Sequence, residues 1–380
     1  MIVHVFNSSI ISGPETLVIP QLNKLEEEVV VIFLSEKRKK EDSKSLLYYA
    51  QQFGLDVEVV FVKKRYDKDA ICELRKVLEK LHPRIVHAHD VKASSYTLWA
   101  TRKIKIDRPK LVSTHHGVRG RYGIKVKLFE SFYTRFILPH FDATLAVCTS
   151  DRDILIKRGL KREKVFLHLN GIDRTLIDFS TRNEKSLAIR KSWDIELDSE
   201  EELVLGYVGR LAKGKGIERV LYVLSQLQKE QKCTNWEFLV FGKGPLEDPL
   251  CLLTKELGLA DKVKFMGYRK EIGNELAGLD LLILLSDAEG LPISLLEAGW
   301  AGTPIFCTAI DGICDLVDWN VKHFLFPADI PNGKIAEQLA FVLNNSAERD
   351  AFALKFQKQV RSKFSATVWI NRLKEIYTLI

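Results

Sequence analysis

The chain reads Ser286-Asp-Ala-Glu-Gly-Leu-Pro-Ile-Ser-Leu-Leu-Glu297-Ala-Gly-Trp-Ala-Gly-Thr-Pro304 directly after an apolar run, 279–285. The run predicts a buried strand that ends in a polar turn, and Pro292 favours the first position of a following helix because it has no N–H to lose. Glu289 then lies on the loop at the carboxyl end of the strand, and Glu297 lies one to two turns into the helix. Both carboxylates can face one pocket, which suits a ligand with phosphate at the helix start and hydroxyls near each carboxylate. For an isolated pair, the simpler interpretation of Glu297 is a charge on the helix surface.

The size and composition of the chain indicate a two-domain globular protein. Its 380 residues exceed a single hydrophobic core, and the hydrophobic fraction is 46% with a mean hydropathy of -0.05. No apolar run approaches the roughly 20 residues needed to span a bilayer, and residues 1–6 predict a first strand rather than a signal peptide. The six cysteines form no C-x2-C pair. We therefore expect neither a zinc site nor a disulfide framework. We expect the protein to reside in a reducing cytoplasm.

The positive charge of the chain is concentrated in one zone. Between residues 102 and 164 there are 16 Lys and Arg against 6 Asp and Glu, a net of +10, whereas the whole chain carries +7. Within this zone, aromatic and aliphatic residues interleave with cations over 118–137, as on an interfacial helix, although a core-facing stripe with a solvated side fits too. The zone favours contact with an anionic membrane surface, and no nucleic-acid recognition module is visible, so we expect no nucleic acid.

Short Val- and Ile-rich runs alternate with helical patterns, which predicts an α/β fold with parallel, doubly wound sheets. Strands are expected at 2–6, 29–34, 57–61, 85–89, 110–114, 143–147 and 165–169, and again at 203–208, 237–241, 263–265, 279–285, 304–307 and 323–325. We predict an N-terminal domain, 1–180, and a C-terminal domain, 181–365, that face each other across a cleft. The last helix, 366–380, is expected to pack back on the first domain. Ligands bind beyond the carboxyl ends of the strands in such sheets.

A basic loop, Gly209-Arg-Leu-Ala-Lys-Gly-Lys-Gly216, follows the strand at 203–208. It nearly matches a P-loop, but a P-loop next needs Ser or Thr to hold magnesium, and this chain has Gly216. Arg210 and Lys215 instead suggest a diphosphate clamp of fixed positive charge. Solvated cations on an ordinary loop are the simpler alternative, and a P-loop-like NTPase remains a second one.

Several other strand ends carry Gly or polar residues. Gly13 precedes a predicted helix and would let backbone approach a phosphate, although turn glycines are common. His116 follows a strand beside a glycine and could contact a sugar or be an ordinary loop residue. Gly242, and the pair Tyr268 and Arg269, end two further strands and could border a nucleobase or form plain turns.

Two short patterns resemble metal sites. His87-Ala-His89-Asp90 places two histidines on one face of a strand, but a third ligand is not evident, so a structural role is preferred. Asp151-Arg-Asp153 resembles a cation-binding D-x-D, but Ser150 is expected to N-cap a helix whose first turn Asp153 then enriches. We predict no metal site.

Taken together, these residues resemble the GT-B glycosyltransferases of the retaining group called glycosyltransferase family 4. The similarity spans nearly the whole chain and is carried by the Gly13 turn, His116-Gly117, Asn170-Gly171-Ile172-Asp173, Gly209-Arg210-Leu211 with Lys215-Gly216, and the segment from Glu289 to Ala298. The resemblance implies that Glu297 binds the ribose of a nucleotide sugar, Glu289 the donor sugar, and Arg210 and Lys215 the diphosphate. It also implies phosphate contacts from the backbone of Gly13, Leu291 and Ile293, a place for Gly290 in the substrate site, and a position for His116 near the transferred sugar. Pro292, Asp311 and Asp315 depart from the commoner pattern, which bears on specificity more than on activity.

The resemblance further implies transfer of a sugar from a nucleotide diphosphate, most commonly UDP, to an acceptor hydroxyl, with retention of the anomeric configuration and without a metal or other cofactor. The basic zone, 102–164, suggests a lipid-linked or membrane-proximal acceptor in polysaccharide, lipopolysaccharide or glycolipid synthesis, at the inner face of the cytoplasmic membrane. The alternatives are a P-loop-like NTPase, a non-catalytic nucleotide-binding GT-B scaffold and a sugar-nucleotide epimerase of the same fold.

Overall fold

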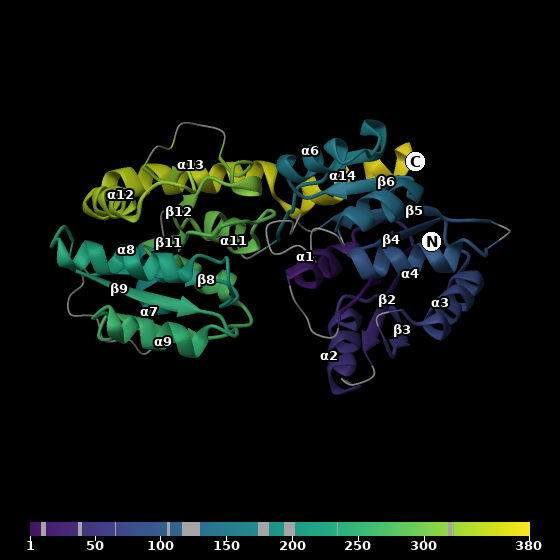
Figure 1. Ribbon diagram of the computed structural model, residues 1–380, viewed down its shortest axis with the longest axis horizontal. Coiled ribbons are helices and arrows are strands. Elements are labelled where there is room, and N and C mark those ends of the chain that lie inside the picture. Colours follow the sequence, from purple (N-terminus) through teal and green to yellow (C-terminus); the bar gives the residue numbers. More distant parts are fainter. Residues whose placement is uncertain are drawn as a thin grey trace. The chain divides into compact units, whose positions relative to one another are not determined.

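The computed structural model describes residues 1–8, 13–36, 40–64, 66–104, 107–115, 130–173, 182–193, 202–233, 235–317, 321 and 323–380. The chain divides into two compact units (Figure 1). Unit 1 comprises Met1–Gly171 together with Ala366–Ile380, and unit 2 comprises Ile172–Ser365. The first crossing between the units therefore lies at Gly171, nine residues before the expected boundary at 180, and the last 15 residues belong to unit 1.

Unit 1 is built on a parallel sheet of seven strands in the order β3-β2-β1-β4-β5-β6-β7. The strands are β1 (Ile2–Phe6), β2 (Val29–Glu36), β3 (Asp56–Val62), β4 (Ile85–Ala88), β5 (Lys110–His115), β6 (Ala143–Ala146) and β7 (Val165–Leu167). The helices of this unit are α1 (Gly13–Leu22), α2 (Lys40–Gln51), α3 (Lys68–Leu81), α4 (Val91–Thr101), α6 (Thr149–Lys157) and α14 (Ala366–Leu379), with a π-helical turn at Tyr133–Ile137. Strand order reverses between β1 and β4, so helices cover both faces of the sheet.

The two faces of the central strands differ in chemistry. Val3 and Val5 belong to an apolar core with residues of α3 and α4 such as Leu74 and Tyr96. His4 points the other way because successive strand residues alternate, and it meets α14 on that side. The face that the C-terminal helix covers is therefore partly polar.

Unit 2 repeats the arrangement with six parallel strands in the order β10-β9-β8-β11-β12-β13. The strands are β8 (Leu203–Val208), β9 (Trp236–Phe241), β10 (Val263–Gly267), β11 (Leu281–Leu284), β12 (Ile305–Thr308) and β13 (Leu325–Phe326). The helices are α7 (Arg182–Ser192), α8 (Ile217–Lys229), α9 (Glu247–Glu256), α10 (Ile272–Glu275), α11 (Ile293–Ala301), α12 (Asn332–Asn344) and α13 (Ser346–Lys363).

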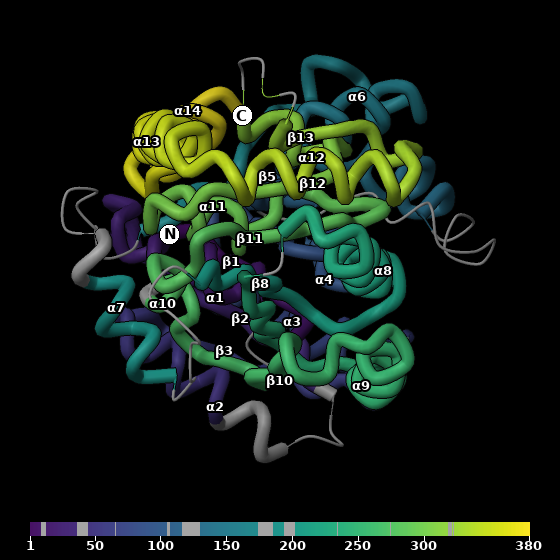
Figure 2. The backbone as a smooth tube through the Cα atoms, turned by 90° about the vertical axis from the view of Figure 1, so that its left-hand side faces the viewer, coloured from purple at the N-terminus to yellow at the C-terminus, as the bar shows by residue number. Residues whose placement is uncertain are grey.

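Helix α11 is held tightly against α13, which both views show beside it (Figure 2). A side chain at Gly299 would meet Val360 Cγ2 at 2.5 Å and Phe356 Cε1 at 2.8 Å, so the missing Cβ lets the two helices approach closely. Gln357 of α13 also donates to the carbonyl oxygen of Trp300 at 3.1 Å. These contacts fix the helix that carries Glu297.

The expected strands all form, with ends that differ by up to two residues. Two expected helix starts were wrong. Pro292 is the N-cap with φ -66 and ψ 125, and the helix begins at Ile293, because the extended ψ of the proline places it outside the helix. Cys148, not Ser150, N-caps α6 and accepts from Asp151 N at 3.4 Å, since the helix begins one residue before Ser150.

Candidate active site

The residues predicted to bind the donor gather at the switch point of the sheet in unit 2. Strand order runs outward in one direction from β8 and in the other from β11, and these two strands are neighbours. The loops that follow them therefore lie side by side at the carboxyl edge, where open α/β sheets bind ligands. The loop after β8 carries Arg210 and Lys215, and the loop after β11 carries Glu289 and Gly290.

The two loops touch through their backbones. Asp287 N donates to Gly214 O at 3.0 Å. Gly216, the N-cap of α8, has φ +72, and a Cβ on it would lie 1.8 Å from Leu285 O. No side chain fits there, so the hydroxyl that a P-loop places at this position is sterically excluded. The structure thus argues against the P-loop-like NTPase.

Lys215 and Glu289 form an ion pair between these loops. Lys215 Nζ lies 2.8 Å from both Oε1 and Oε2 of Glu289. The Lys215 side chain is 34% exposed and that of Glu289 11% exposed, so the ammonium faces outward while the carboxylate lies deeper. A cation expected on the diphosphate and a carboxylate expected on the sugar are therefore in direct contact.

Arg210 lies on the same loop as Lys215 and is exposed. Its backbone carbonyl accepts from the hydroxyl of Tyr207 at 3.2 Å. Tyr207 is fully buried, and burial raises its pKa, with the Glu289 carboxylate adding to the shift. A neutral buried phenol thus anchors the backbone from which the guanidinium extends.

Glu297 is the fifth residue of α11 and is 7% exposed. The interpretation as a helix-surface charge was therefore wrong. A carboxylate at this depth requires partners, as buried charges do in general. Leu291 is buried and Ile293 half-buried at the start of the helix, where Pro292 provides no side-chain cap.

The remaining predicted contacts of unit 2 lie on the adjacent strands. Gly242 follows β9 with φ +143, and a Cβ on it would lie 1.9 Å from Gly209 O, so the β9 loop packs directly on the basic loop. Gly242 N also donates to Gly267 O at 2.8 Å, which links it to the last residue of β10, directly before the loop that carries Tyr268 and Arg269. On that loop Tyr268 is 63% exposed, and within the described part of the chain Arg269 Nε is buried without a hydrogen-bond partner.

Unit 1 has a matching switch point between β1 and β4. Gly13 begins α1 beyond β1, whereas His116 lies outside the described residues. Asp90 N-caps α4, accepting from Lys92 N at 2.7 Å and Ala93 N at 2.8 Å, and it accepts from Asn7 N at 2.9 Å. Burial raises the pKa of Asp90 to about 6. Its position at the end of the His87-x-His89 pattern is thus explained by helix capping.

His87 and His89 do cluster with a third histidine, His4, on the polar face of the sheet. The rings are already engaged with one another and with hydroxyls. His4 Nδ1 lies 2.8 Å from His89 Nε2, while His87 contacts Tyr377 Oη at 2.6 Å and Thr114 Oγ1 at 2.7 Å. Burial lowers the pKa of His4 to about 3, which favours a neutral His4 ring. The arrangement is that of a hydrogen-bonded polar core.

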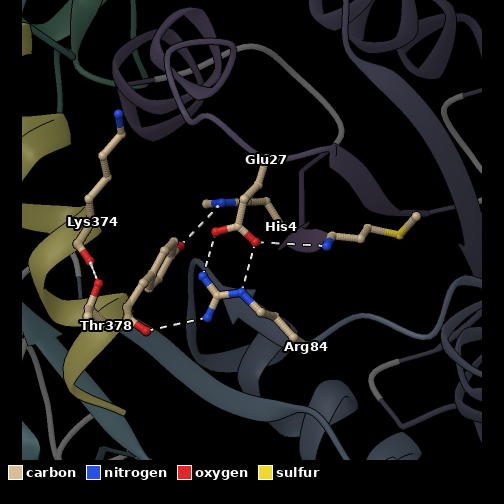
Figure 3. Close-up of polar contacts among 7 residues, drawn as sticks. His4, Glu27, Arg84, Lys374 and Thr378 are labelled. Atoms are coloured by element: carbon tan, nitrogen blue, oxygen red, sulfur yellow. Dashed lines mark hydrogen bonds and ion pairs between the residues drawn. The ribbon is translucent and has the colours of Figure 1, made fainter.

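Tyr377 connects this cluster to the surface of unit 1, where Figure 3 shows Arg84 paired with Glu27. Its hydroxyl lies 3.3 Å from His4 Nε2, and its backbone carbonyl accepts from Arg84 at 3.4 Å. Arg84 in turn pairs with Glu27, and its Nε lies 2.8 Å from Glu27 Oε2. The cluster therefore docks helix α14 on the sheet.

Part of the basic zone forms an exposed aromatic surface. Phe132 and Phe136 are 49% and 53% exposed, and their ring centroids lie 5.2 Å apart. The guanidinium of Arg135 lies 6.0 Å from the Phe136 ring. Residues 116–129 of the zone lie outside the described residues. Among the described helices, none has the length and apolar character to cross a bilayer.

Two residues of the site had been missed. Ser286 is buried and donates to Glu289 Oε1 at 2.8 Å, and Tyr207 holds the carbonyl of Arg210. In the sequence, Ser286 only begins a polar turn, and Tyr207 lies in an apolar strand. The available signal was that each stands three residues before a predicted site residue, Glu289 or Arg210.

Comparisons with known proteins agree with this geometry. The family described as glycosyl transferases group 1 matches residues 189–359, and that described as glycosyltransferase family 4 matches residues 16–176. N-acetyl-alpha-D-glucosaminyl L-malate synthase of Bacillus anthracis is 24% identical over 322 residues, which are 84% of this chain and 80% of that protein. The putative colanic acid biosynthesis glycosyltransferase WcaL of Escherichia coli (strain K12) is 27% identical over 282 residues, 71% of this chain and 64% of that protein.

The fold also matches solved structures. The crystal structure of Anabaena Alr3699/HepE in complex with UDP and glucose superimposes with a TM-score of 0.81 and 20% identity, over 100% of both chains. The two doubly wound parallel sheets and the two family matches, which together span most of the chain, lead to one assignment. The chain belongs to the glycosyltransferases of group 1 and family 4, and it has the GT-B fold.

Proposed function

We propose that this glycosyltransferase moves a sugar from a UDP-sugar to an acceptor hydroxyl with retention of configuration and without a metal ion. The observation that carries the proposal is the contact of Lys215 with Glu289 beside Arg210 at the switch point of unit 2. The arrangement supplies cations for a diphosphate and a carboxylate for sugar hydroxyls from adjacent loops. The complexes of HepE with UDP and with UDP-glucose support the choice of donor class.

The chemistry needs stabilisation of the leaving group. Cleavage of the donor builds negative charge on the diphosphate while the sugar becomes oxocarbenium-like. Fixed cations aimed at that charge stabilise the transition state, and two cationic side chains on one loop meet this need. Glu297, buried in the helix that follows, would hold the ribose, and Arg269 and Tyr268 would border the base.

The proposal is tested by nucleotide release. We expect UDP to be released from a UDP-hexose when acceptors are supplied, at a rate unchanged by EDTA, and the product to keep the anomeric configuration of the donor by NMR. Mg-ATP should not be hydrolysed. Binding of UDP without transfer to any acceptor would favour a non-catalytic scaffold, and interconversion of donors without acceptor would favour an epimerase.

We further propose that the basic zone, 102–164, brings unit 1 to an anionic membrane surface, where a lipid-linked acceptor for polysaccharide synthesis would be found. The exposed pair Phe132 and Phe136 beside Arg135 supports this, because amphipathic surfaces insert aromatic rings while cations attract anionic headgroups. The colanic acid relative supports a polysaccharide product.

Replacing both phenylalanines tests the surface. F132S/F136S should lower binding to vesicles containing anionic phospholipid by roughly tenfold or more, because about 0.8 kcal/mol is lost per CH₂ withdrawn from the bilayer. Binding is measured by co-sedimentation. Tyr48→Ser removes an aromatic ring that is 67% exposed outside the zone, and it should leave binding unchanged. Equal losses in both variants, or none in the double variant, would contradict the proposal.

A further inference from the structure

The buried hydroxyl of Ser286 contacts both loops of the candidate site. Ser286 follows β11 by two residues and is 1% exposed. Its Oγ lies 2.8 Å from Glu289 Oε1 and 3.3 Å from Lys215 O. A hydroxyl has one hydrogen to donate, and the shorter, charge-assisted bond to the carboxylate is the stronger of the two. The main acceptor of Ser286 is therefore Glu289.

The backbone around this hydroxyl is fixed from both sides. Thr308 Oγ1, at the end of β12, donates to Ser286 O at 2.7 Å. The next residue, Asp287, donates its N–H to Gly214 O at 3.0 Å on the basic loop. Because its backbone is held in place, the Ser286 hydroxyl restricts the orientations that the Glu289 carboxylate can adopt.

The carboxylate in turn restricts Lys215. Both of its oxygens lie 2.8 Å from Lys215 Nζ. A lysine ammonium on its flexible four-carbon stem samples many rotamers unless a partner holds it. The orientation of the Glu289 carboxylate therefore selects the position of the ammonium, which remains partly exposed toward solvent.

We propose that Ser286 is a positioning residue for sugar transfer: it orients Glu289, and Glu289 holds Lys215 where charge develops on the diphosphate. The inference rests on the proposed function and extends it. Ser286, Glu289 and Lys215 act as one unit, so the carboxylate that faces the sugar also sets the cation that faces the phosphates. A residue beneath the donor site would then influence both halves of the donor.

A double-mutant cycle tests this coupling between Ser286 and Glu289. Ser286→Ala should lower kcat roughly tenfold, or about 1.4 kcal/mol, with a smaller change in KM, because it removes a charge-assisted hydrogen bond that orients the carboxylate. In a Glu289→Ala background, adding Ser286→Ala should change the rate by less than about twofold, because the residue through which Ser286 acts is gone. UDP affinity, measured by calorimetry, should follow the same non-additive pattern and provides the cycle if Glu289→Ala has too little turnover.

The control is Ser225→Ala in α8 of unit 2, which removes a buried hydroxyl that donates to Leu257 O, at the end of α9, at 3.2 Å. It should leave kcat and UDP affinity unchanged. If the effects of Ser286→Ala and Glu289→Ala on both kcat and UDP affinity multiply independently, Ser286 has a merely structural role and the inference fails. If the unmodified protein transfers no sugar but the effects of the two substitutions on UDP affinity are non-additive, the proposed function fails while the coupling of Ser286 to Glu289 is supported.

Discussion

Replacing Arg210 or Lys215 by alanine should lower kcat/KM for sugar transfer by roughly 30- to 1000-fold. Each change removes a fixed cation from the place where the diphosphate gains charge, and the loss of one such donor costs about 2–4 kcal/mol of transition-state stabilisation. Initial rates of UDP release at several donor concentrations provide the measurement. Lys215→Ala has an added effect, because it leaves the Glu289 carboxylate without the ammonium that lies 2.8 Å away.

Two further variants sharpen this comparison. Lys213→Ala removes an exposed cation from the same loop and should keep near-normal kcat/KM. Glu297→Ala should mainly raise KM, since a ribose contact serves ground state and transition state alike. Near-normal turnover in the Arg210 or Lys215 variant would refute the diphosphate clamp.

Gly216→Ala should lower the free energy of unfolding of unit 2 by about 3 kcal/mol or more and abolish donor binding. The new Cβ would lie 1.8 Å from Leu285 O, a backbone atom that cannot turn aside, and the residue would keep φ near +72. Overpacking and left-handed strain each cost about 1–3 kcal/mol. Urea denaturation followed by circular dichroism measures the stability, and calorimetry with UDP measures the binding.

A second glycine, Gly258, provides a control that separates backbone strain from steric clash. Gly258 has φ +71, but a Cβ there meets nothing within 4 Å. Gly258→Ala should therefore cost only about 1 kcal/mol, the strain of a left-handed residue alone, and leave UDP binding intact. Equal destabilisation by the two substitutions would show that loop contact at Gly216 is not what matters.

Much of the fold could be predicted from periodicity, because fully buried parallel strands are continuous apolar runs. The strands 2–6 and 203–208 were placed to the residue. The order of strands in each sheet is not written in any local pattern, since it depends on contacts between distant segments. The first segment of unit 1 ends at Gly171 and not at the expected 180, because the polar stretch near 171–200 gives no sharp boundary signal.

The candidate site was predictable in part. Glu289 and Lys215 stand 74 residues apart, and only the rule that ligands bind beyond parallel strand ends linked them before their contact was seen. The burial of Glu297 could not be predicted, because it depends on the tertiary packing around α11 and not on the local sequence pattern. Ser286 was missed for a similar reason: a serine in a turn is ordinary until its neighbours are known.

Helix α14 makes unit 1 depend on a segment that follows unit 2 in the sequence. The strands of its sheet lie within the first 171 residues, yet Tyr377 occupies the histidine cluster between β1, β4 and β5. During synthesis these strands emerge from the ribosome long before the helix that covers them. Unit 2 is thus encoded as an insertion, and unit 1 can be completed only after residues 366–380 have been translated.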